Sequence, residues 1–248
     1  MKIKGAVALV TGANRGLGKA YAEALLGAGA VRVYAGARDP SGIASGDPRL
    51  VPLRLDVTSP DDVAAAVASC PDVNLLINNA GVMLMTSMLR PDSEAALRAE
   101  FEVNVIGMQR MIRAFAPGLA SHGGGGIINM LSVVSWFTGP FNSTYGASKH
   151  AALVVSDAAR IELASQGTRV VGVYAGFIDT DMAAGVNMPK TSPRQVAEAS
   201  LDGLENGLDH VQADDRAREI WQATRTDPAA LAANMAKMWA AGGKPYSD

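Results

Sequence analysis

The stretch Ala6-Val-Ala-Leu-Val-Thr-Gly-Ala-Asn-Arg-Gly-Leu-Gly18 decides the fold of this chain. Its first five residues are apolar and predict a short buried strand, and the Ala- and Leu-rich segment that follows through Ala30 predicts a helix. A glycine-rich turn between a strand and a helix presents unpaired backbone amides to an anion, as in sites that bind the diphosphate of a dinucleotide. The spacing is G-x-x-x-G-x-G and not the commoner G-x-G-x-x-G, so this turn alone does not identify a nucleotide site.

The same alternation of strands and helices continues along the chain. Further strands are predicted over residues 31–35, 50–55, 73–77, 127–131 and 169–174, with a short edge strand over 209–213. Helix starts are predicted where a capping residue precedes proline, at Ser59-Pro60, Ser192-Pro193 and Asp227-Pro228. Short connections predict one doubly wound Rossmann-type α/β domain over residues 1–248, with a mostly parallel sheet of about seven strands and helices on both faces. We expect a substrate loop at about 180–195, a C-terminal helical extension at about 214–248, and binding at the carboxyl ends of the strands.

Composition narrows the classes of function. The chain has 248 residues, of which 48% are hydrophobic, and its net charge of −2 without a basic block argues against nucleic acid as a partner. No stretch approaches the ~20 apolar residues that span a bilayer. The single cysteine, Cys70, excludes an internal disulfide and suits a reducing compartment. We therefore expect a soluble cytoplasmic protein. The three histidines are scattered and show no spacing typical of metal ligands, so no metal is expected.

The end of the second predicted strand bears on the choice of cofactor. In a dinucleotide-binding fold, an acidic residue at this point would bind the 2′-hydroxyl of NAD. Ala37 occupies that place, Arg38 follows it, and Arg15 lies in the glycine-rich turn. Two guanidinium groups without a carboxylate suit a 2′-phosphate and predict NADP(H) in preference to NAD(H). Asp39 comes one residue too late for the acidic position and suits the start of the next turn. The alternative is that both arginines are ordinary surface residues.

Tyr145 and Lys149 lie four residues apart, so on a helix they share one face. A tyrosine hydroxyl ordinarily titrates near pH 10, and a neighbouring ammonium favours its ionised form. Such a tyrosine is a general acid that can protonate a carbonyl oxygen while hydride reaches the carbon. Taken alone, the pair is more often an ordinary part of an amphipathic helix, so the interpretation depends on the rest of the chain.

Several motifs together resemble the short-chain dehydrogenase/reductase family in order and spacing, including thirteen positions from Ser132 to Tyr145. They are Thr11-Gly12-x-x-x-Gly16-x-Gly18, Asp56, Asn78-Asn79-Ala80-Gly81, Asn104, Ser132 and Tyr145-x-x-x-Lys149. The resemblance spans about residues 3–182. It implies that Tyr145 is the proton donor and that Lys149 lowers its pKa and binds the nicotinamide ribose. It also implies that Ser132 binds the substrate oxygen and that Asn104 holds a water linking Lys149 to a proton relay.

The resemblance also implies a set of cofactor contacts. The turn from Gly12 to Gly18 would hold the diphosphate, Asp56 the adenine amino group, Asn79 the adenosine side, and Thr180 the carboxamide. The full predicted set is Gly12, Asn14, Arg15, Gly16, Leu17, Gly18, Arg38, Asp56, Val57, Asn79, Ala80, Gly81, Tyr145, Lys149, Gly176, Ile178 and Thr180. In this family the basic pair resembles the NADP-preferring subtype.

Two departures from the family pattern stand out. Ala175-Gly176 replaces the usual Pro-Gly before the nicotinamide loop, and the usual glycine-containing C-terminal strand is not recognisable. The second departure puts the family's common tetramer in doubt. A homodimer through the long helices, a homotetramer and a monomer all remain open.

The predicted function is an NADPH-dependent reductase of a ketone or aldehyde, reversible as an alcohol dehydrogenase. The alternatives are a non-catalytic NADP(H)-binding redox sensor and a halohydrin dehalogenase, which would carry Arg where Lys149 stands. The small-molecule substrate is expected to be apolar, because apolar side chains would border its pocket; the same residues could equally be packing. These residues are Met83, Met85, Trp136, Phe137 and Met182.

Overall fold

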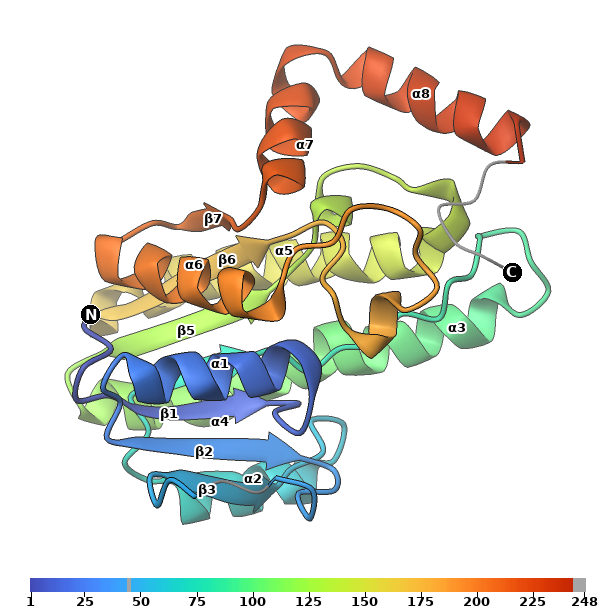
Figure 1. Cartoon of the computed structure of the whole chain (residues 1–248). Helices are drawn as coiled ribbons and strands as arrows, with labels where there is room; N and C mark the ends of the chain where they lie inside the picture. The colour runs from blue at the N-terminus through green and yellow to red at the C-terminus, as the bar shows by residue number, and fades with distance from the viewer. Residues whose placement is uncertain (44–45, 243–248) are drawn as a thin grey trace.

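The computed structural model describes residues 1–43 and 46–242, which contain a seven-stranded sheet (Figure 1). The strand order is β3-β2-β1-β4-β5-β6-β7, and every neighbouring pair is parallel. The strands are β1 Val7–Thr11, β2 Arg32–Ala37, β3 Leu50–Arg54, β4 Leu75–Asn78, β5 Gly125–Met130, β6 Thr168–Tyr174 and β7 His210–Gln212. The predicted doubly wound parallel sheet, including its short edge strand, is confirmed.

Helices lie on both faces of this sheet. The helices of the described residues are α1 Gly16–Gly27, α2 Pro60–Ser69, α3 Ser93–Phe101, α4 Met108–Ser121, α5 Ser143–Leu163, α6 Pro193–Asn206, α7 Asp215–Thr226 and α8 Pro228–Ala240. Helices α1 and α6 pack together in front of the sheet in Figure 1, and α2, α4 and α5 lie behind it. The predicted caps form as expected, because Ser59, Ser192 and Asp227 each accept a hydrogen bond from a backbone amide of the first turn.

Strand β5 begins earlier than the sequence predicts. The prediction places this strand over residues 127–131, whereas Gly125 and Gly126 are already part of β5. A Cβ on Gly125 would collide with the carbonyl oxygen of Asn74, so the strand needs glycine where it passes this neighbour.

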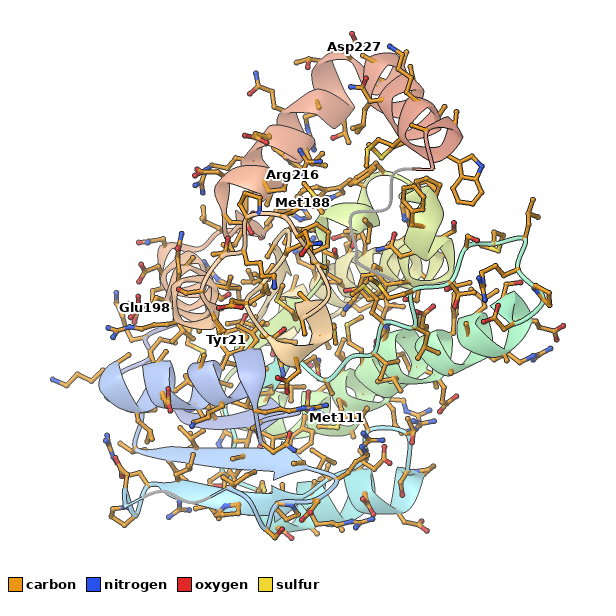
Figure 2. All side chains as sticks on the ribbon, turned by 45° about the vertical axis from the view of Figure 1, so that its right-hand side comes forward. Tyr21, Met111, Met188, Glu198, Arg216 and Asp227 are labelled. Atoms are coloured by element: carbon orange, nitrogen blue, oxygen red, sulfur yellow. The ribbon has the colours of Figure 1, made fainter. Side chains whose placement is uncertain are left out.

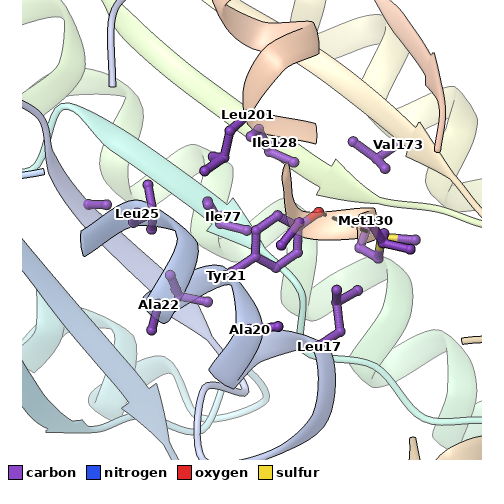
Figure 3. Close-up of a cluster of buried hydrophobic side chains, with 14 of the residues drawn as sticks. Leu17, Ala20, Tyr21, Ala22, Leu25, Ile77, Ile128, Met130, Val173 and Leu201 are labelled. Atoms are coloured by element: carbon purple, nitrogen blue, oxygen red, sulfur yellow. Dashed lines mark hydrogen bonds between the residues drawn. The ribbon is translucent and has the colours of Figure 1, made fainter. Parts of the chain in front are cut away.

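Tyr21 fixes α1 against the rest of the α1–α6 face. Its side chain is fully buried among the aliphatic side chains shown in Figure 3. Its hydroxyl lies 2.7 Å from Ser200 Oγ of α6, so the polar tip is satisfied. Burial raises the pKa of this tyrosine well above its ordinary value. Tyr21 therefore anchors α1, which begins at the glycine-rich turn, to α6 and to the core on this face of the sheet.

The strand order reverses between β1 and β4, and this reversal positions the site. β1 pairs with β2 on one side and with β4 on the other, so the connections leave in opposite directions and open a crevice at the carboxyl ends. Thr11 Oγ1 ties the two strand ends together by accepting hydrogen bonds from Asn79 N at 3.0 Å and Ala80 N at 2.9 Å.

The predicted C-terminal extension forms α7 and α8, and its residues 243–248 lie outside the described residues. Helix α7 leaves the sheet after β7, and α8 runs back above the carboxyl-end side of the molecule (Figure 1). Asp227, labelled in Figure 2, lies at the corner between them. No residue of α8 is fully buried. Across residues 1–43 and 46–242, no helix has both the length and the apolar character needed to cross a bilayer.

Candidate active site

The glycine-rich turn is shaped by close backbone contacts. Gly12 and Gly16 have φ of +66° and +53°, in the left-handed region that favours glycine. A Cβ on Gly18 would collide with the Gly12 carbonyl oxygen, and Asn79 Nδ2 donates to the Thr11 carbonyl at 2.9 Å. No side chain caps α1 at Arg15, in contrast to the capped starts of α2 and α6. The first amides of α1 therefore lack a side-chain partner, as expected for an anion site.

At the end of β2, Ala37 is buried and Arg38 is exposed. Asp39 accepts a hydrogen bond from Ser41 N at 3.0 Å and so starts a turn. Burial opposes ionisation of Asp56, but hydrogen bonds from Thr58 and the positive charges of Arg38 and Arg54 outweigh burial, and the pKa of Asp56 lies below its ordinary value. Arg38 thus acts electrostatically on the predicted adenine-binding carboxylate.

The other predicted adenosine and diphosphate residues lie around the same crevice. Arg15 is exposed and forms an ion pair with Asp181 at 3.1 Å. Val57 is buried and its carbonyl accepts from Arg110 Nη1 at 2.6 Å, and Asn14 is exposed in the turn before α1. Leu17 is buried in the core cluster of the α1–α6 face, so its side chain serves packing.

Thr180, which is predicted to contact the carboxamide of the nicotinamide, lies next to the glycine-rich turn that is predicted to hold the diphosphate. A Cβ on Gly16 would lie 3.2 Å from Thr180 Cγ2. The loop that carries Thr180 is closed at its base, where Ile178 pairs with Thr191 and the Phe177 carbonyl accepts from Thr191 N at 2.8 Å. Two segments more than 150 residues apart therefore face each other across the crevice.

Lys149 is a buried cation, 5% exposed, at the centre of the site. Its Nζ donates to the Met130 carbonyl at 2.8 Å and lies 5.6 Å from the centroid of the Tyr145 ring. A Cβ on Gly81 would lie 3.8 Å from this Nζ. Burial lowers the pKa of Lys149 to about 8. The structure therefore places Lys149 beside the Tyr145 ring and near Gly81 after β4.

Asn104 lies in a π-helical turn, η1 Glu102–Gly107, between α3 and α4. Its Nδ2 donates to the Val82 carbonyl and to Ser148 Oγ, both at 2.9 Å, and its Oδ1 accepts from Val82 N at 2.9 Å. Single π-helical turns in long helices are frequent at functional sites, where they re-aim a side chain. Here the amide of Asn104 joins the loop after β4 to α5 next to Lys149.

Ser132 follows β5 and is 9% exposed. Its Oγ accepts from Val134 N at 3.4 Å, which starts a short 3-10 turn, η2 Val133–Ser135. Because Lys149 binds the carbonyl of Met130 on the same strand, Ser132 and Lys149 both lie at the carboxyl end of β5. Tyr145 lies in the first turn of α5, one turn before Lys149.

The structure groups only two of the five predicted pocket residues. Trp136 and Phe137 line a cavity of 590 Å³, whereas the three methionines do not line it. Met83 Sδ accepts from Asn142 Nδ2 at 3.8 Å, and Met85 has φ of +56°, the only positive value at a non-glycine residue in the described chain. Met182 is 47% exposed on the loop of Thr180.

Two buried carboxyl groups near the site escaped the sequence analysis. Asp214, 3% exposed, accepts from Gly176 N at 2.9 Å and Thr191 Oγ1 at 3.2 Å, and it caps α7 by accepting from Ala217 N at 2.7 Å. Its position after an edge strand and before a helix was a readable cap signal. Glu100, fully buried on α3, accepts from Leu84 N at 2.7 Å, and burial raises its pKa. Nothing in the sequence around Glu100 indicates its burial.

Residues 6–191 match the sequence profile of the family described as short chain dehydrogenase. The chain belongs to the short-chain dehydrogenase/reductase family. It is an oxidoreductase of that family, and the motif residues named above occupy the crevice at the carboxyl ends of its strands. Helices α7 and α8 lie outside the matched residues.

Individual relatives agree with this assignment. The crystal structure of a short chain dehydrogenase from Burkholderia cenocepacia J2315 in complex with NADP is 44% identical, covers 95% of this chain and 99% of its own, and has a TM-score of 0.91. An uncharacterized oxidoreductase of Staphylococcus saprophyticus is 30% identical over 220 residues, which are 83% of this chain and 93% of the relative. A 3-oxoacyl-(acyl-carrier-protein) reductase of Vibrio cholerae is 34% identical over 195 residues, covering 75% and 79%.

Among the described residues, no group of three or more His, Cys, Asp or Glu side chains is placed to hold a metal ion. The three histidines take other contacts. His122 Nε2 lies 3.0 Å from the Pro71 carbonyl, His150 Nδ1 lies 2.9 Å from the Gly146 carbonyl, and His210 Nδ1 lies 2.9 Å from the Tyr174 hydroxyl.

Proposed function

We propose that this protein is an NADPH-dependent reductase of ketones or aldehydes, reversible as an alcohol dehydrogenase. The observation that carries the proposal is the buried ammonium of Lys149, held by the Met130 carbonyl and facing the Tyr145 ring at the end of the crevice. A buried lysine without a carboxylate partner is costly for stability, and such groups concentrate at functional sites.

The residues present fit a nicotinamide dinucleotide. The turn at Gly12 and Gly16 brings backbone close to the crevice without a Cβ, and the uncapped start of α1 suits a diphosphate. Arg38 and Arg15 would bind a 2′-phosphate, because Ala37 leaves no acidic side chain for a 2′-hydroxyl. The similar Burkholderia enzyme contains NADP, which supports this preference.

A reduced nicotinamide dinucleotide held in the crevice would supply the hydride for the carbonyl carbon. Tyr145 donates its hydroxyl proton to the carbonyl oxygen, and the Ser132 hydroxyl donates a hydrogen bond to the same oxygen and orients it. Lys149 places a positive charge beside Tyr145, where negative charge develops as the proton leaves. Asn104 acts through its hydrogen bonds to Val82 and Ser148, which fix the loop against α5.

The test is the oxidation of NADPH with a panel of ketones and aldehydes, followed by absorbance. Tyr145→Phe should lower kcat by about 100-fold or more while NADPH still binds, because only proton donation is removed. Binding is measured separately by nucleotide fluorescence. If wild-type protein binds NADPH tightly and reduces no member of the panel, the redox-sensor alternative is the correct one.

Lys149→Ala provides a second test of the same site. It should weaken NADPH binding and also lower kcat, because one ammonium is proposed to serve the ribose and Tyr145 together. Gln109→Ala, an exposed change on α4, is the matched control and should alter neither value. Full activity in Lys149→Ala would end the proposed mechanism.

A further inference from the structure

The cavity of 590 Å³ lies between three segments that are far apart in the sequence. One wall is the loop that contains Met88, another is the segment from Trp136 to Ser143, and the third is α8. Its volume falls in the range of about 300–1,000 Å³ that is typical of small-molecule sites. None of the side chains that line it is charged.

The cavity borders the segment between two proposed site residues, Ser132 and Tyr145, although neither of these two residues lines it. Trp136 and Phe137 lie in the segment that joins Ser132 to Tyr145, and Ser143 is the first residue of α5, two positions before Tyr145. A molecule in the cavity would therefore contact the same segment that carries the proton donor.

Helix α8 lies over the cavity and is not packed into a hydrophobic core. Leu231 and Met235 are half-buried and face the cavity, and no residue of α8 is fully buried. The Trp239 ring lies 5.3 Å from the Phe141 ring, which brings the far end of α8 to the opposite rim. An apolar helix face over an open cavity leaves apolar surface in contact with solvent unless a ligand fills it.

Aromatic rings connect the base of this cover to the sheet. Trp136 stacks on Tyr174 of β6 with ring centroids 3.9 Å apart, and Trp221 of α7 lies 4.6 Å from Trp136. Asp227 caps the start of α8 by accepting from Ala230 N at 2.9 Å. Helix α7 is therefore tied to the cavity wall through Trp221, and α8 follows it directly.

We infer that α8 and the Trp136–Ser143 segment bind the apolar part of the substrate, which makes the substrate an uncharged carbonyl compound with a long alkyl chain or an aromatic ring. The inference rests on the proposed reductase function and names its substrate class. A keto acid, a sugar acid or a phosphorylated carbonyl would place a charge in a cavity that offers no countercharge. Because α8 lies beyond residues 6–191, this selectivity belongs to a part of the chain outside the family match.

Two methionines of the same helix allow a matched test. Met235→Trp fills the cavity, and Met238→Trp places the same side chain at a residue that does not line it and is 36% exposed. With methyl ketones from butanone to decanone, Met235→Trp should lower kcat/KM for the longest ketone by about tenfold or more and change butanone by less than about twofold. Met238→Trp should behave as wild type. Equal losses on all chain lengths, or none, would overturn the inference.

A binding measurement separates this inference from the proposed function. The uncharged dye N-phenyl-1-naphthylamine should bind wild-type protein saturably, with affinity weakened about tenfold in Met235→Trp and unchanged in Met238→Trp. If the dye binds in this pattern but no carbonyl is reduced with NADPH, the reductase proposal fails and the apolar site stands. If reduction occurs and neither dye binding nor chain-length preference responds to Met235→Trp, the apolar site is wrong. If light scattering shows that the wild-type protein dimerises, and dye binding is lost as the dimer forms, the inference would also be overturned, because a second copy would then cover the cavity.

Discussion

Arg38 is exposed at the end of β2, and the buried Ala37 before it has no polar side chain to bind a ribose hydroxyl. Arg38→Asp replaces a side chain that would bind the 2′-phosphate of NADP(H) with one that would bind the 2′-hydroxyl of NAD(H). We expect the ratio of kcat/KM for NADPH to that for NADH to fall at least about tenfold, the size of one lost charge-assisted hydrogen bond. Arg194→Asp, an exposed change on α6, should leave the ratio unchanged. An unchanged ratio in Arg38→Asp would contradict the assignment of Arg38 to the 2′-phosphate.

Glu100 predicts a pH dependence of stability. Its pKa is raised by burial above the ordinary value of 4.5, so the folded protein holds this proton to a higher pH than the unfolded chain. The stability contributed by the neutral acid is complete below pH 4.5 and is lost as the pH rises through the raised pKa.

Glu100→Gln stays neutral at every pH and keeps an oxygen for Leu84 N. The free energy of unfolding of this variant should therefore rise relative to wild type as the pH increases above 4.5, by at most about 1.4 kcal/mol per pH unit. Urea unfolding at several pH values measures the difference. Glu94→Gln, an exposed change on the same helix, should show a difference that does not vary with pH. A difference that does not vary with pH for Glu100→Gln would mean that folding does not raise the pKa of Glu100.

At the scale of elements, the loop between β6 and α6 is held at its base by another element of the chain. Asp214, the cap of α7, binds Gly176 N at the start of this loop and Thr191 Oγ1 at its end. The Ala175-Gly176 turn, where the family usually has Pro-Gly, is thus fixed by a carboxylate. Asp214 therefore connects the start of α7 to both ends of the loop that carries Thr180.

Asp214→Ala should lower the free energy of unfolding by about 2–4 kcal/mol, because it removes a helix cap and leaves Gly176 N without its acceptor. It should also raise the KM for the cofactor, since the loop that carries Thr180 loses the hydrogen bonds that hold its two ends. Asp215→Ala is the control: this neighbour is exposed and pairs with Arg218, so its loss should cost less than about 1 kcal/mol. Similar losses in both variants, measured by urea unfolding, would show that the contacts of Asp214 contribute little.

At the scale of the molecule, the sheet order gathers residues from the whole chain at one edge. The glycine turn follows β1, Gly81 follows β4, Ser132 follows β5 and Thr180 follows β6. Because all seven strands are parallel, each of these segments leaves the sheet at its carboxyl edge. The site is therefore a property of the topology and of no single motif.

The long helix α5 bears on the assembly of subunits. Val154 and Ile161 are 68% and 78% exposed and lie seven residues apart, so they share one face. If a dimer forms through the long helices, replacing both residues with Glu should convert it to monomers in light scattering. Val31→Glu, at another exposed apolar residue, should not. A wild-type protein that is monomeric, or a double variant that stays dimeric, would exclude this interface.

By itself, the sequence determined the strand–turn–helix start, the parallel doubly wound fold, and the pairing of Tyr145 with Lys149. These features depend on short spacings: glycine at φ above zero, apolar runs of strand length, and a four-residue step along one helix face. Such local patterns survive in any context that lets the segment fold, so they can be read without coordinates.

Only the tertiary structure decided the burial of Glu100 and Asp214, the separation of Met83 and Met182 from the cavity, and the position of α8 above Trp136. Each of these depends on contacts between segments far apart in the chain. Whether a carboxyl group is buried, or an apolar side chain faces a cavity or a core, is set by what packs against it. No local spacing encodes that partner, so the sequence predicts the reacting groups more completely than the pocket around them.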